Sequence, residues 1–203
     1  MMSGSRALCA SIVGSCLISV LAGCGGSGGA GAVFAAPATA SFSPSGSAAT
    51  ENQVRLVGRS TGEDEVTVDV VIAGPTDSSD LYAFSFGLEV GDPTVAEYVF
   101  GSQEVGTALD TTGCHDPFLI VSPGMQPGLL TVSLTKLGNC PGNGIPAGEE
   151  MIIALAFQVE PERSTTIRLA GQSPGGDPSA IGSAHAVIDS VVFDQNSARF
   201  SGR

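Results

Sequence analysis

The sequence contains no tryptophan and is poor in aromatic and charged side chains. Among its 203 residues are 2 Tyr and 9 Phe, and charged residues make up 14%, against roughly 25% in an ordinary soluble protein. Lys and Arg number only 8 against 20 Asp and Glu, which gives a formal net charge of −12. A chain without a cluster of basic residues cannot neutralise nucleic-acid phosphates or attract an anionic membrane surface. We therefore expect no nucleic-acid partner, and membrane contact only through a covalent lipid.

Catalytic signatures are also missing. The two histidines are His115 and His185, and no G-x-S-x-G, HExxH, P-loop or Rossmann motif occurs. Acidic turns such as Glu63-Asp64-Glu65 and Gly176-Asp177-Pro178 do not supply the converging oxygen ligands of a calcium loop. We expect a protein that is not an enzyme and that holds no cofactor. Paired carboxylates of the glycosidase type stay open, because a sequence does not place two carboxylates in one cleft.

Residues 1–23 have the pattern of a secretion signal. Arg6 precedes an apolar stretch, Ala7 to Leu21, which at about 15 residues is shorter than the roughly 20 that span a bilayer. The stretch ends in Leu21-Ala22-Gly23-Cys24, which resembles the lipobox of bacterial lipoproteins. The resemblance implies cleavage before Cys24, its acylation, and anchoring in the cell envelope. Gly25 in the next position resembles outer-membrane sorting in a Gram-negative cell. An ordinary signal peptide cut elsewhere and a chance apolar segment are the alternatives.

Residues 24–53 consist mainly of Gly, Ala, Ser, Pro and Thr with almost no charge. Such a composition cannot bury enough apolar surface to offset the entropy of ordering the chain. We therefore expect a lipidated cysteine followed by a flexible tether over 24–53, and a folded domain over 54–203.

From Val54 onward, short segments of alternating apolar and polar residues predict an all-β sandwich. The clearest is Leu81–Val90, in which Tyr82, Phe84, Phe86, Leu88 and Val90 share one face. Glu150–Val159 is apolar on both faces, so we expect a strand covered on both sides, with a helix as the alternative. Nine strands are predicted, and in a domain of about 150 residues they can share one two-sheet core. The nine are Val54–Val57, Glu65–Ala73, Leu81–Val90, Val95–Phe100, Phe118–Val121, Leu129–Lys136, Glu150–Val159, Thr165–Leu169 and Ala186–Phe193.

Three segments carry a family resemblance. Val66–Ile72 has the pattern V-x-V-x-V, Leu81–Val90 runs into the acidic-Pro turn Asp92-Pro93, and Ala147–Glu150 leads into a long apolar strand. This order resembles cohesin domains, the jelly-roll β-sandwich modules of bacterial cellulosomes and related surface proteins. The resemblance covers about Val54 to Phe200 and implies a nine-stranded jelly roll that binds a surface or secreted protein. Carbohydrate-binding modules share much of the pattern, so a module assisting polysaccharide breakdown is the alternative.

The resemblance also suggests where a partner would bind. In cohesins a dockerin docks on the flat outer face of one sheet and contacts polar side chains of the third strand. The matching positions here, Ala83, Ser85 and Gly87, are too small to act as anchors, which argues against a dockerin. We expect a flat protein-binding face, with ordinary solvated strand positions as the alternative. It combines outward side chains of two strands: Ser85, Glu89, Thr131, Ser133 and Thr135.

Of the five cysteines, two lie in the signal and Cys24 takes the lipid, which leaves Cys114 and Cys140. Two thiols in an exported domain suggest one disulfide. A zinc site formed by Cys114-His115-Asp116 and Cys140 is the alternative, although structural zinc sites usually hold closely spaced thiol pairs.

A sugar site usually stacks its ligand on aromatic faces, and few are available. Tyr82 belongs to the apolar face of its strand, so Tyr98 is the candidate sugar contact. One ring is a poor platform, which places polysaccharide binding behind protein binding.

Overall fold

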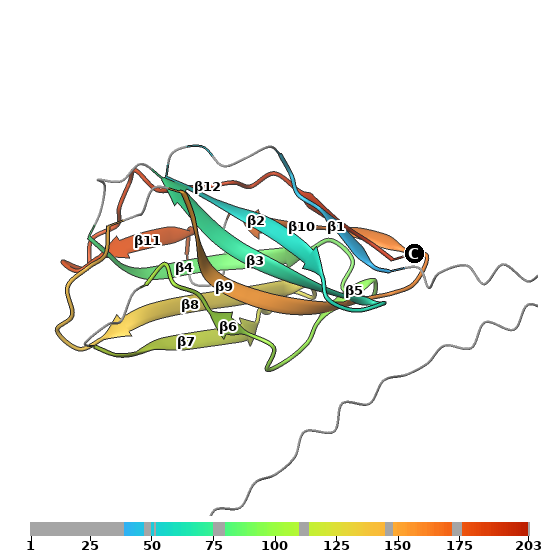
Figure 1. The fold of residues 1–203 in the computed structure, drawn as a ribbon, viewed down its shortest axis with the longest axis horizontal. Coiled ribbons are helices and arrows are strands. Elements are labelled where there is room, and N and C mark those ends of the chain that lie inside the picture. Colours follow the sequence, from blue (N-terminus) through green and yellow to red (C-terminus); the bar gives the residue numbers. More distant parts are fainter. Residues whose placement is uncertain are drawn as a thin grey trace, which may run out of the picture. The chain divides into compact units, whose positions relative to one another are not determined.

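A computed structural model of the chain describes residues 39–46, 50, 52–74, 80–109, 114–144, 148–171 and 176–202. The predicted signal peptide, the predicted lipidation site Cys24 and most of the predicted tether lie outside the described residues. Every regular element of the described residues is a β-strand, and they form two facing sheets (Figure 1). Within these same ranges no helix could cross a membrane.

The first sheet, sheet A, has seven strands in the order β1-β13-β10-β4-β8-β7, and β11 also pairs with β4. All pairs within it are antiparallel. Its strands are β1 (Ser41–Ser43), β4 (Leu81–Val90), β7 (His115–Pro123), β8 (Leu129–Leu137), β10 (Ser164–Ala170), β11 (Ser179–Gly182) and β13 (Ala198–Ser201).

The second sheet, sheet B, has six strands in the order β12-β2-β3-β9-β5, and β6 also pairs with β9. The β12–β2 pair is parallel and the others are antiparallel. Its strands are β2 (Gln53–Ser60), β3 (Glu65–Gly74), β5 (Ala96–Tyr98), β6 (Glu104–Val105), β9 (Gly148–Val159) and β12 (Val192–Phe193).

The core lies between the two sheets and is filled by the inward side chains that the alternation predicts. The five predicted inward residues of β4, from Tyr82 to Val90, are all buried. From sheet B, Phe157 of β9 meets Phe200 of β13, with ring centroids 5.2 Å apart. Each such fully buried side chain contributes about 1.5–3 kcal/mol relative to exposure. The prediction of an all-β two-sheet sandwich is confirmed.

Strand β9 is covered on both sides, as its sequence predicts, and the helix alternative for Glu150–Val159 is wrong. Ala154 and Ala156, on the side away from Phe157, are also buried. Ile152, predicted on that same side, belongs instead to the core cluster, because the pairing of β9 with β3 shifts register at this residue. The segment after β5 runs along the edge of β9, because the Val99 N–H donates to the Ala156 carbonyl at 2.9 Å.

The predicted boundary between tether and domain at residue 53 is wrong. Ala40 is fully buried, and Ser41–Ser43 forms β1, which pairs with β13 at the opposite end of the chain. Phe42 of β1 packs against Phe200, with ring centroids 5.5 Å apart. One aromatic side chain between two serines therefore brings this short segment into the fold. The composition of the segment does not predict this pairing, because the partner strand β13 lies far along the chain.

The predicted count of nine strands is also too low, since the described residues form 13. The additional strands are β1, β6, β11 and β13, each of two to four residues and too short to show alternation. Two predicted strands are shorter than expected. Val95–Phe100 ends at Tyr98, where a turn begins, and Ala186–Phe193 retains only Val192–Phe193. A turn closed by the Val191 N–H on the Ile188 carbonyl interrupts the latter.

Candidate functional site

The outer face of sheet A carries all five residues of the predicted binding face. Strands β4 and β8 are in register so that Ser85 lies opposite Ser133, with their Oγ atoms 3.4 Å apart. Thr131 and Thr135 lie two positions to either side of Ser133, so they point the same way. Glu89 lies two pairs beyond Gly87 on the same side of β4. The structure therefore places these side chains on the same face of two neighbouring strands.

Glu89 does not present a free charge. Its Oε2 atom accepts hydrogen bonds from Nε and Nη2 of Arg168 on β10, at 2.9 Å and 2.6 Å. Both side chains are exposed, so the pair contributes only about 0–1 kcal/mol to stability. Its consequence is electrostatic, because the Arg168 guanidinium balances the charge of the Glu89 carboxylate.

Two large apolar side chains, absent from the prediction, lie on the same face. Phe118 and Ile120 of edge strand β7 lie opposite Thr135 and Ser133 of β8, and residues directly opposite each other share a face. They are 51% and 44% exposed, whereas the intervening Leu119 packs against the core. Sequence reasoning missed them, although the run Phe118–Val121 is apolar at every position. A segment that is apolar on both faces is also the basis for predicting that β9 is covered on both sides.

The central strand β4 gives this face little relief. Ala83 and Gly87 are buried between their neighbours, and Ser85 is only half-buried. This agrees with the expectation that β4 offers no large anchor. The protruding apolar surface comes from β7, at the edge of the sheet.

A disulfide joins Cys114 and Cys140, as predicted, with Cα atoms 6.2 Å apart. It closes the end of the β7–β8 hairpin opposite its turn, so it holds β7 against β8. The zinc alternative is wrong, because both thiols are used in the disulfide. In the described parts of the chain, no three His, Cys, Asp or Glu side chains gather as metal ligands.

Tyr98, the candidate sugar contact, is half-buried instead of free. Its hydroxyl donates to Oε1 of Gln103 at 2.6 Å, and its ring packs on Phe157 with centroids 6.0 Å apart. Burial raises the pKa of this phenol. The hydroxyl and part of the ring already have partners within the protein, which leaves a poor stacking platform.

Solved structures with a similar fold come from Acetivibrio cellulolyticus. A type II cohesin domain of its cellulosome is 14% identical, with a TM-score of 0.52, over 79% of this chain and 94% of that one. A type II cohesin dyad from its adaptor scaffoldin is 15% identical, with a TM-score of 0.54, over 73% of this chain and 48% of that one. The chain has the fold of a cohesin domain. This confirms the predicted fold resemblance.

A third cohesin-fold neighbour was solved as part of a type II cohesin–X–dockerin complex. It is 13% identical, with a TM-score of 0.52, and the match covers 70% of this chain and 92% of that one. No family model matches the sequence, and no curated protein matches it either. The likeness to cohesins is therefore one of structure.

Proposed function

We propose that this chain is a non-enzymatic protein-binding module that holds its partner on the outer face of sheet A. The observation that carries the proposal is the exposure of Phe118 and Ile120 beside a flat surface of Ser and Thr side chains. A flat face suits a protein partner better than a small ligand, which needs a concave site. Large apolar side chains are the usual source of binding energy in such contacts.

The geometry favours an interface with its anchors on β7 and a smooth centre on β4 and β8. Buried apolar surface stabilises a complex by roughly 25 cal/mol per Å² before the costs of association. The small side chains around Ser133 allow a partner to approach closely. The disulfide keeps β7 in place, so little ordering of this strand is needed on binding.

The cohesin neighbours support a protein as the partner, since one of them was solved in a complex with an X–dockerin. The objection to a dockerin concerns Ala83, Ser85 and Gly87, which are too small to anchor it. Phe118 and Ile120 supply large side chains from β7 instead. We therefore include a dockerin-type module among the protein partners.

The test is capture of envelope and secreted proteins on the immobilised full chain. Ser133→Arg places a bulky charge at the centre of the face, and Phe118→Ser removes one anchor. Each should weaken the captured partner's binding about tenfold or more. Val192→Ser is the matched control, since Val192 is exposed on β12 of sheet B. Equal capture by the wild type and all three variants would exclude this face.

We further propose that Cys24 carries the lipid that attaches the module to the cell envelope, in the outer membrane of a Gram-negative cell. The proposal rests on Leu21-Ala22-Gly23-Cys24 after an apolar stretch, and two or more acyl chains suffice for stable anchoring. Cys24→Ser should release the protein from the membrane fraction. A variant that still sediments with membranes and is cleaved at the same bond contradicts it.

A further inference from the structure

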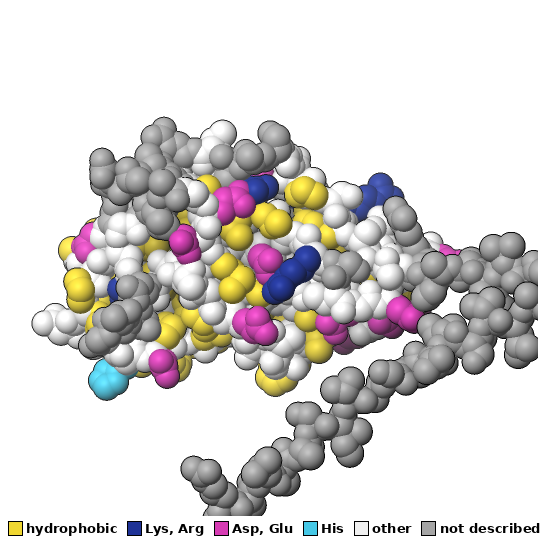
Figure 2. Space-filling model, viewed as in Figure 1, with side chains coloured by type: hydrophobic (Ala, Val, Ile, Leu, Met, Phe, Trp, Pro, Cys, Tyr) yellow, Lys and Arg dark blue, Asp and Glu magenta, His cyan; other side chains and the backbone are white. Residues whose placement is uncertain are grey.

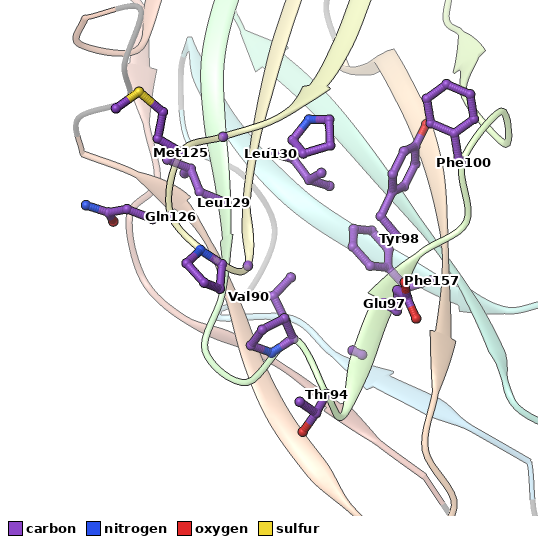
Figure 3. A pocket seen from close by; sticks show the side chains of 16 residues that line it. Val90, Thr94, Glu97, Tyr98, Phe100, Met125, Gln126, Leu129, Leu130 and Phe157 are labelled. Carbon is purple, nitrogen blue, oxygen red and sulfur yellow. The ribbon is translucent and has the colours of Figure 1, made fainter.

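A groove of about 880 Å³ opens at the end of the sandwich that carries the β7–β8 turn, away from the disulfide. Its walls are the end of β4 and the β7–β8 turn on one side and β5 on the other (Figure 3). Its floor is the core itself, since Val90, Leu130 and Phe157 are all buried. On the rim, Phe100 is 81% exposed and Met125 is 91% exposed.

The backbone that carries Phe100 is held in a hydrogen-bonded turn. The Ser102 N–H donates to the Val99 carbonyl at 3.1 Å, and Gly101 has a φ of 86°, as the third residue of a type II turn requires. Ser102 also accepts a hydrogen bond on Oγ from the Ala156 N–H at 3.0 Å. The exposed ring therefore projects from a turn attached to β9.

Met125 projects from a turn that is attached to β4. The Val90 N–H donates to the Gly128 carbonyl at 2.8 Å, and the Leu129 N–H donates to the Gln126 carbonyl at 3.1 Å. Gly128 has a φ of 81°, and a Cβ there would overlap the Val90 carbonyl. A binding site with its walls fixed in advance loses less conformational entropy on association.

The rim shows what kind of occupant fits. A small apolar molecule at the floor of the groove would leave Phe100 and Met125 largely in water, because both stand at its rim and are mostly exposed. A partner that extends across both rims would cover them together with the groove. In Figure 3 these two side chains lie on opposite sides of the groove. A sugar is the polar alternative, but the Tyr98 hydroxyl already donates a hydrogen bond to Gln103.

The charged side chains near the groove indicate the chemistry of its occupant. Among the described residues that line the groove, Glu97 alone has a charged side chain, and it is exposed. Asp64 and Glu160 lie at the same end of the sandwich. The Val159 N–H donates to the Asp64 carbonyl, and the Glu160 N–H donates to the Val95 carbonyl. Asp92, also at this end, is paired with Arg163 at 3.2 Å. On the face drawn in Figure 2, acidic side chains outnumber basic ones. Carboxylates beside an apolar groove favour a cationic partner.

We propose that this groove is a second docking site, and that its occupant is a segment of a partner protein in which a large apolar residue is flanked by Lys or Arg. The apolar side chain enters between Phe100 and Met125, and the basic side chain lies near Glu97. The site is separate from the outer face of sheet A, so neither surface depends on the other for its test.

The experiment selects short random peptides displayed on phage against the full chain. Enriched peptides should combine an aromatic or large aliphatic residue with Lys or Arg. Synthetic copies, measured by fluorescence anisotropy, should bind Phe100→Ser and Met125→Ser about tenfold more weakly than the wild type. Glu97→Lys should also weaken the binding of these peptides to the chain, and so should added salt. Both rim side chains are largely exposed, so these variants leave the core intact.

Val192→Ser is the matched control, because it removes an exposed apolar side chain on β12 that belongs neither to the groove nor to the outer face of sheet A, and it should bind the peptides like the wild type. Phe118→Ser tests whether the peptides bind the outer face of sheet A instead. Loss of binding in Phe118→Ser alone would overturn the groove as the site while supporting the face. Enrichment of acidic peptides, or of none, would overturn the proposal. So would displacement of the peptides from wild type by xylo-oligosaccharides, which would place a sugar in the groove.

Discussion

Gly58 on β2 leaves the space that the ring of Phe42 on β1 fills. A Cβ atom built on Gly58 would overlap the Cβ and ring atoms of Phe42, which are the least mobile part of that side chain. The two strands belong to different sheets. This contact therefore fastens the first strand of the domain to the opposite sheet.

Gly58→Ala should destabilise the domain, because Phe42 or the β1 backbone must move to admit the methyl group. Overpacking of this kind typically costs about 1–3 kcal/mol, measured as the free energy of unfolding in urea. Gly46→Ala is the control, since a Cβ at Gly46 meets nothing within 4 Å. Equal stability of the two variants would show that β1 contributes nothing to the folded state.

Removal of the disulfide should also destabilise the domain. Cys114 and Cys140 are 26 residues apart, and closing a loop of this length stabilises a fold by roughly 3–4 kcal/mol in the chain-entropy model. The variant with Cys114→Ser and Cys140→Ser should lose this amount and should match the reduced wild type. Alkylation of both thiols in the folded, unreduced chain would refute the pairing.

Asp80 should make stability depend on acid pH. Hydrogen bonds from Ser183, and a further one from the Gly142 N–H, hold the pKa of this carboxyl below its ordinary value of 3.8. Its contribution is therefore complete above pH 3.8 and is lost as the pH falls through the lower folded value. Asp80→Asn should lower Tm at neutral pH and converge with the wild type in strong acid. A Tm difference that does not change with pH would contradict this.

Asp69 should make stability depend on pH in the opposite direction. Burial raises its pKa, Arg59 at 3.5 Å lowers it, and Glu104 raises it, with a net increase above 3.8. Its Oδ1 atom is buried with no hydrogen-bond partner. Because the fold disfavours the charged form, its stability contribution declines as the pH rises through the folded value. The Tm of Asp69→Asn relative to wild type should therefore rise with pH. A relative fall would mean that the ion pair with Arg59 dominates.

The long strands could be predicted from the sequence because their alternation is local. The inward residues of β4 and the two-sided burial of β9 both follow from the order of side chains along one segment. The outward positions of Ser85 and Ser133 follow from the same alternation. Their closeness to each other depends on the pairing of β4 with β8.

What the sequence did not predict depends on partners far along the chain. Ser41–Ser43 becomes a strand because Phe42 packs against Gly58 and Phe200. A segment of three residues is too short for its own pattern to predict such a contact. Phe118 and Ile120 are exposed because they lie on the outer face of β7, at the edge of sheet A. An apolar run has the same appearance in an edge strand as in a central one. The groove beside Phe100 likewise requires β5 and the β7–β8 turn to meet.

Strand β1 also determines how the domain should respond to mechanical load. A pull on the residues before Ala40 reaches β1 first, and within the described residues β1 pairs only with β13, over three positions. Apart from this pairing, β1 is held by Phe42 against Gly58 and Phe200 and by the Ala40 N–H on the Glu63 carbonyl. In the part of the chain that the structure describes these contacts are few, so β1 should detach at a lower force than the longer strands of the sheet. Strands β10 and β4 separate this edge from β8 and β7. We therefore expect β1 to detach first under load, while the surface around Phe118 stays folded.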